Sequence, residues 1–145
     1  MEVTISTWVV ALLGFALMGL LMVLQGLAIA RPRAPWTIQN VYGGDPEGTD
    51  ARAYFAFNQG WAWADSVFWG PVQLAGSVGM LFGSRWGFLL ALVGSVPFWY
   101  SAIPIFIWDR DMGFRKNTIA YWVFAWGIFP TFGLVEMGYC IWRLL

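Results

Sequence analysis

Four long apolar stretches, separated by short polar segments, dominate the pattern of the chain. A helix needs about 20 mostly apolar residues to cross the hydrocarbon core of a bilayer, because each residue advances it by about 1.5 Å. Inside lipid, backbone amides must be satisfied within their own segment, so each stretch is predicted to be a helix. The chain is therefore predicted to be an all-α integral membrane protein, one four-helix transmembrane bundle, with helices over residues 5–30, 60–82, 86–108 and 119–142.

The polar segment 31–59 is predicted to be the one sizeable loop, and its end has two interpretations. From Ala51 onward the residues suit either an interfacial helix or an early start of the second span. A span that begins near Gly60 places Asp65 at the membrane interface. A span that begins near Ala51 places Asp65 several turns inside, where it is buried.

Lysine and arginine are distributed unevenly between the polar segments. The segments 31–59 and 109–117 carry six of the eight cations, whereas Arg85 and Arg143 lie on the opposite side. The positive-inside rule then predicts that these two loops are cytoplasmic and that both termini are outside. This bias is consistent with a multi-pass protein of a prokaryotic inner (plasma) membrane.

The composition of the chain argues against several classes of function. The chain has 59% hydrophobic and 11% charged residues, whereas soluble domains have about a quarter charged. Its formal net charge of zero gives no indication of a nucleic-acid partner. The absence of histidine argues against His-based metal sites and His-activated nucleophiles, and the single Cys140 cannot form an internal disulfide. We therefore predict no catalytic residues, metal or cofactor.

Asp65 and Glu136 are the two acids inside predicted spans, and intramembrane carboxylates are functional candidates because their burial is costly. Asp65 is either an acid favoured by the helix dipole near a helix start or a buried ligand or proton site. Glu136 belongs to a stripe typical of helix packing, with Arg143 or Arg85 as a partner. Alternatively, it is a protonatable or cation-binding site. The two acids are expected at opposite depths, which argues against a two-carboxylate mechanism.

Prolines at positions 71, 97, 104 and 130 are expected to kink every span except the first. Such kinks are either satisfied by neighbouring helices or open a central cavity. A cavity would suit a flat apolar or cationic guest through stacking or cation-π contacts. The predicted ligand-binding residues are the two acids together with the aromatic and polar residues near the kinks: Asp65, Trp69, Gln73, Trp99, Tyr100, Ser101, Trp126 and Glu136.

Two further patterns concern packing. Gly79 and Gly83 form a Gly-x-x-x-Gly motif, which favours close helix contact or self-association into a homo-oligomer. The stretches 63–71 and 122–130 both read Trp, an aromatic-rich run with Trp-Gly, then Pro. This internal echo would fit duplication of a two-helix hairpin.

One local pattern resembles the emopamil-binding (EXPERA) family of four-helix sterol isomerases and ligand-binding proteins. Asp65 precedes Pro71 by six residues, and the helix is followed by a short basic turn with tryptophan, Gly83-Ser84-Arg85-Trp86. The similarity covers about 30 residues and lacks that family's histidine. It implies sterol-like or isoprenoid ligands.

These observations leave three classes of function open. The favoured class is non-enzymatic: a small tryptophan-rich membrane protein that binds a hydrophobic or aromatic small molecule, or an accessory subunit of a larger membrane complex. The first alternative is a proton- or cation-coupled transporter or channel component that uses Glu136 and Asp65. The second is a histidine-free lipid- or sterol-modifying enzyme.

Overall fold

The computed structural model describes residues 1–42, 51–112 and 119–145, and its regular structure in these residues is entirely helical. Three helices are long and apolar enough to cross a membrane: Ile5–Ala30, Arg85–Trp108 and Ile119–Leu144. The predicted all-α fold is thus confirmed, together with three helices that could span a membrane.

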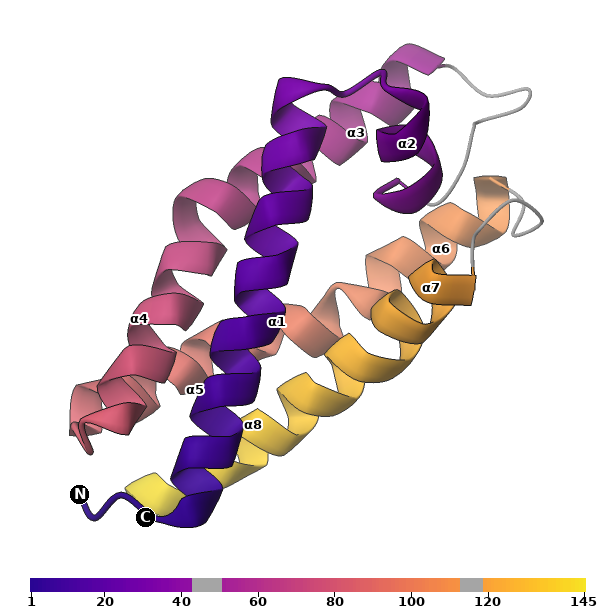
Figure 1. The fold of residues 1–145 in the computed structure, drawn as a ribbon. Coiled ribbons are helices and arrows are strands. Elements are labelled where there is room, and N and C mark those ends of the chain that lie inside the picture. Colours follow the sequence, from indigo (N-terminus) through magenta and orange to yellow (C-terminus); the bar gives the residue numbers. More distant parts are fainter. Residues whose placement is uncertain (43–50, 113–118) are drawn as a thin grey trace.

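The helices form two diverging pairs (Figure 1). The first pair is α1 (Ile5–Ala30) and the continuous helix made of α3 (Ala51–Ala64), η1 (Asp65–Trp69) and α4 (Gly70–Leu81). The second pair is α5 (Arg85–Tyr100) with α6 (Ala102–Met112), and α7 (Ile119–Trp122) with η3 (Val123–Ile128) and α8 (Phe129–Leu144). Both termini and the α4–α5 turn lie at one end, here called the terminal end. The short α2 (Pro35–Asn40) lies with α3, α6 and α7 at the opposite end.

The segment 31–59, predicted as a loop with two interpretations of its end, is partly helical, in agreement with the interpretation in which the next helix begins near Ala51. It contains α2, and the next helix begins at Ala51 rather than at residue 60. The reason is tertiary packing that the local sequence does not reveal. Tyr54, only 2% exposed, packs in a cluster with Ala28, Tyr42 and Ala62. Residues 43–50 of this segment lie outside the described residues.

Two of the three predicted kinks are π-helical turns placed just before a proline. In η1 the amide of Gly70 donates to the carbonyl of Asp65, and Pro71 follows. In η3 the amide of Phe129 donates to the carbonyl of Phe124, and Pro130 follows. Because proline lacks an N–H and its ring crowds the preceding turn, a wider turn at this point relieves both problems. The sequence echo is therefore also an echo of backbone geometry.

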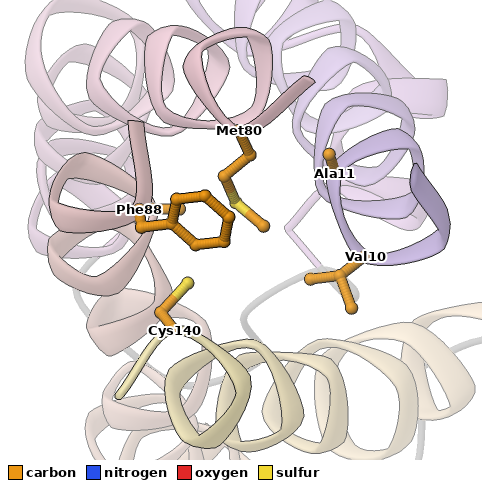
Figure 2. Close-up of a cluster of buried hydrophobic side chains, with 6 residues drawn as sticks. Val10, Ala11, Met80, Phe88 and Cys140 are labelled. Carbon is orange, nitrogen blue, oxygen red and sulfur yellow. The ribbon is translucent and has the colours of Figure 1, made fainter. Parts of the chain in front are cut away.

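Small residues allow the helices near the terminal end to cross closely. Gly79 of α4 and Gly87 of α5 meet backbone to backbone, since a Cβ on Gly87 would lie 2.2 Å from the carbonyl carbon of Gly79. Gly83 adopts φ 64° in the α4–α5 turn, a conformation that favours glycine. Around this crossing a core of apolar side chains from all four long helices comes together (Figure 2): Val10, Ala11, Met80, Phe88, Ala91 and Cys140.

The outer surface of the molecule is strongly apolar. Val67 and Phe68 on η1 are each 68% exposed, and many large apolar side chains on the other long helices are also exposed. Soluble monomers rarely expose apolar surface on this scale, so the exterior is consistent with a membrane protein.

Candidate functional site

A cavity of about 350 Å³ lies between the two helix pairs, on the side away from the terminal end. Its walls come from α1, α2, α3, η1, α6, α7, η3 and the start of α8. The lining is mostly apolar and aromatic, with a few polar groups: Leu20, Leu21, Leu24, Gln25, Trp36, Asn40, Val41, Tyr42, Phe57, Asn58, Trp61, Asp65, Trp69, Ser101, Ile105, Trp108, Ala120, Tyr121, Phe124, Ala125 and Phe129. This composition is typical of a small-molecule site.

Asp65 is the one charged side chain among the described residues that line the cavity. It is 5% exposed, and its Oδ2 accepts a hydrogen bond of 2.6 Å from Nε2 of Gln25 on α1. The Gln25 amide donates a hydrogen bond to one oxygen of the carboxylate but supplies no positive charge. Since α3 begins at Ala51, Asp65 lies several turns inside its helix, which decides between the two interpretations of this residue in favour of burial.

Several indole rings line the same cavity as Asp65. Trp69 follows Asp65 by one turn, and its Nε1 donates to the carbonyl of Gly94 at 2.7 Å, which fixes the ring. Trp108 on α6 stacks on Phe57 of α3, with ring centroids 4.3 Å apart and planes at 16°. The Nε1 of Trp108 is buried and has no hydrogen-bond partner among the described residues. The aromatic rings that line the cavity are therefore held in place by stacking and by a hydrogen bond.

Polar contacts close the end of the cavity near α2. The hydroxyl of Tyr42 donates to the carbonyl of Ala28, near the end of α1, at 3.2 Å. The Nε2 of Gln59 donates to the same carbonyl and, at 3.3 Å, to the Tyr42 hydroxyl. Burial raises the pKa of Tyr42 above its usual value, and the hydrogen bond from Gln59 offsets part of this rise. Tyr42 thus stays neutral and ties α2 to α1 and α3.

A second polar cluster lies outside the lining of the cavity, and we call it the polar centre: Glu136 of α8 with Gln73 and Ser77 of α4. Glu136 and Gln73 are both fully buried. The Nε2 of Gln73 lies 2.8 Å from Oε1 and 3.0 Å from Oε2 of Glu136. Asp65 and Glu136 thus have different partners and do not form an acid pair.

Arg143, one predicted partner of Glu136, has other contacts. Its guanidinium donates to the hydroxyls of Thr7 at 2.8 Å and Tyr139 at 2.9 Å, and it also contacts the carbonyl of Glu2. Arg85, the other predicted partner, is exposed at the start of α5. The structure therefore does not show the predicted pairing of Glu136 with Arg143 or Arg85.

The structure divides the predicted ligand-binding residues into three groups. Asp65, Trp69 and Ser101 line the cavity, while Gln73 and Glu136 form the polar centre. The remaining three lie in neither: Tyr100 is 54% exposed, Trp126 packs against Phe106 and Trp122, and Trp99 is partly buried. Whether any of them binds a ligand stays a prediction.

Several lining residues were missed from the sequence. Gln25, the partner of Asp65, gives one signal, because it is the only amide in an otherwise apolar first helix. Trp36, Trp61 and Trp108 also line the cavity, and their place there depends on α2 folding back over α1 and α3. Sequence periodicity carries no information on that packing.

Fold and site together define the class: an α-helical protein with helices able to span a membrane and an aromatic cavity that contains a buried carboxylate. Comparison with known proteins adds no relative, since no family model, curated protein or solved structure matches the chain.

Proposed function

We propose that the chain is a small integral membrane protein whose cavity binds an apolar, aromatic guest that carries a positive charge. The observation that carries this proposal is Asp65: a buried carboxylate with one amide partner, in a cavity lined by aromatic rings and by no Lys or Arg among the described residues. A carboxylate removed from water without a cation is costly, and a cationic guest would lower that cost.

The aromatic walls support the same class of guest. Cations are attracted to the faces of indole rings by about 0.5–2 kcal/mol, and most strongly when both partners are desolvated. Trp61, Trp69 and Trp108 all line the cavity that Asp65 enters. A flat apolar body would fill the space between the rings, and its charged group would lie against the carboxylate. The size of the cavity suits a small organic molecule.

We further propose that α3–η1–α4 is a fourth transmembrane helix, with both termini outside in a prokaryotic inner membrane. This helix packs along α1 and α5, and its outward residues Val67, Phe68 and Val78 are apolar and exposed. The end near the cavity carries Arg31, Arg33 and Arg110, which supports a cytoplasmic position for that end under the positive-inside rule.

The experiment compares two probes of the same shape, a biphenylmethyl trimethylammonium ion and its neutral isostere with carbon in place of nitrogen. Binding is measured by calorimetry and tryptophan fluorescence on protein in nanodiscs, with empty nanodiscs subtracted. The cation should bind more tightly than the isostere. Asp65→Asn should weaken binding of the cation by about tenfold or more, which corresponds to about 1.4 kcal/mol, and leave the isostere unchanged.

Asp111→Asn is the matched control, because it removes the same charge from a side chain that is 65% exposed and outside the cavity. It should leave the affinities of both probes unchanged. If neither probe binds, the result would contradict the proposal that the cavity is a guest site. Equal affinity of wild type and Asp65→Asn for the cation would contradict the role of Asp65.

A further inference from the structure

The polar centre contains a carboxyl group with no compensating charge. Glu136 lies in a helix able to span a membrane and is 0% exposed. Its described hydrogen-bond partner is the neutral amide of Gln73. An ionised carboxylate in such a place costs several kcal/mol unless it is paired, so Glu136 must bind a positive charge or become neutral.

None of the helices around Glu136 brings a described cation to it. On the side of α1 it meets Gly14, and on the side of α4 it meets Gln73, whose amide also contacts the Ser77 hydroxyl at 3.5 Å. From α5, Gly94 lies against the Gln73 amide, and the neighbouring Ser95 donates its hydroxyl to the carbonyl of Leu92. Along α8 the next titratable groups are Tyr139, Cys140 and Arg143, and Arg143 is held by hydrogen bonds to Thr7 and Tyr139.

The amide of Gln73 is suited to partner a neutral acid. Its Oε1 is buried and has no hydrogen-bond partner among the described residues, while its Nε2 faces both oxygens of Glu136. The two ends of an amide are nearly identical in shape, so their assignment follows the hydrogen-bond network. Rotation of the amide by 180° would place Oε1 2.8–3.0 Å from the Glu136 oxygens, where it accepts a hydrogen bond from a protonated carboxyl.

Glycines in the neighbouring helices leave room for the side chains of Glu136 and Gln73. A Cβ on Gly14 would lie 2.9 Å from the Gln73 amide and 3.0 Å from both Glu136 Oε1 and the Ser77 hydroxyl. A Cβ on Gly94 would lie 2.1 Å from Oε1 of Gln73. Both glycines therefore leave room for the amide and the carboxyl group at the place where four helices meet.

We propose that the Glu136–Gln73–Ser77 centre is a binding site for one proton. A proton from water adds to one carboxylate oxygen of Glu136, the charge of the group changes from −1 to 0, and the new O–H donates to Oε1 of the rotated Gln73 amide. Release reverses these changes, and the amide N–H again donates to the carboxylate. The site lies outside the lining of the guest cavity, and the proposal does not rest on the proposed function.

One contact chain joins this proton site to the cavity. Trp69 lines the cavity and donates to the carbonyl of Gly94, and Gly94 lies directly against the Gln73 amide. Rotation of the Gln73 amide would thus change the contact with Gly94, which is hydrogen-bonded to Trp69 in the cavity wall. This arrangement places the proton site where it can influence the guest site.

Infrared difference spectroscopy tests the proposal directly. The chain contains only three glutamates, so Glu2→Gln/Glu47→Gln leaves Glu136 as the single one with the polar centre intact. In this variant, labelled with ¹³C-glutamate and placed in nanodiscs, a labelled carboxylic acid band should be present at neutral pH. The band should convert to carboxylate bands as the pH is raised. Adding Glu136→Gln should remove every labelled band, and Asp65→Asn should leave the band in place.

Two results would overturn the proposal. One is a labelled glutamate that shows only carboxylate bands, or an acid band that never titrates, at every pH where the protein stays folded. The other is an acid band that is lost at constant pH on addition of sodium chloride but not of choline chloride, since this would assign the centre to a small metal cation. Tryptophan fluorescence, recorded on the same samples, establishes which samples are folded.

Discussion

At Gly14 the lack of a side chain allows polar groups from two other helices to meet beside α1. Gln73, Ser77 and Glu136 all approach to within about 3 Å of the place where a Cβ would stand. These groups are bonded to one another and cannot move apart without exposing a buried polar atom, which costs about 1–3 kcal/mol. The glycine is therefore part of the polar centre even though it contributes no functional group.

Gly14→Ala is expected to lower the free energy of unfolding by about 1–3 kcal/mol, because the added methyl group overpacks this centre. Gly19→Ala on the same helix is the control, since a Cβ there would meet nothing within 4 Å. It should be neutral or stabilise the helix by up to about 1 kcal/mol. Thermal unfolding followed by fluorescence in detergent measures both. Equal unfolding midpoints for the two variants would contradict the close packing at Gly14.

Residue-scale prediction from the sequence succeeded where periodicity was enough. The spacing of Asp65, Trp69 and Gln73 predicts one inward face, and all three are buried. It failed for partners, because the contacts of Asp65 with Gln25 and of Glu136 with Gln73 join residues far apart in the chain. Glu136 and Gln73 were both named as candidates, but nothing in the sequence indicated that they touch.

At the scale of elements, the crossing of α4 and α5 fixes the terminal end of the molecule. Gly76 packs against the backbone of Ala91, and Gly79 packs against that of Gly87. The predicted Gly-x-x-x-Gly motif thus has two separate uses, because Gly79 serves the crossing while Gly83 serves the turn. Close contact of this kind is a main source of helix association in lipid, where apolar side chains gain little by leaving the solvent.

Gly87→Ala is expected to be severely destabilising, by about 3 kcal/mol, because the new Cβ would lie 2.2–2.6 Å from backbone atoms of α4 that cannot rotate away. The matched control is Gly138→Ala on α8, where a Cβ meets nothing within 4 Å. Size-exclusion chromatography of the solubilised protein, with unfolding midpoints, compares them. Wild-type behaviour of Gly87→Ala would show that the crossing is looser than described.

The prolines illustrate what the sequence predicts about elements. Their positions correctly located the irregular turns, and the break between α5 and α6 falls at Ser101, between Pro97 and Pro104. The type of irregularity was not predictable, because a π-turn and a simple kink can both accommodate a proline, which has no N–H to donate. The start of α3 at Ala51 was also left open, since packing of Tyr54 against Tyr42 determines it.

At the scale of the whole molecule, the apolar exterior is consistent with a membrane protein, and the distribution of charge supports the proposed orientation. The all-helical fold and three of its long apolar helices followed from the pattern of apolar runs alone. The place of the cavity did not, because it results from the divergence of two helix pairs and from α2 folding over their open end (Figure 1). Only the assembled fold brings the lining residues of α1, α3 and α6 together.

The proposed orientation predicts which end of the molecule is accessible from outside the cell. In a Cys140→Ser background, Leu145→Cys should react with a membrane-impermeant maleimide on intact cells, and Gln39→Cys should react only after lysis. Both positions are exposed and Cys140 is buried, so the labelling reports sidedness. The reverse pattern would contradict the orientation, and labelling of both positions on intact cells would contradict opposite sides for them.

The most direct test of the central claim is the position of a bound guest. A crystal structure of the protein with an iodinated biphenylmethyl trimethylammonium ion would locate the iodine by its anomalous signal. The proposed guest site predicts an iodine peak inside the cavity, among Trp61, Trp69 and Trp108, with the ammonium group beside Asp65. An iodine peak only on the lipid-facing surface, or a cavity filled by its own side chains with no guest, would contradict it.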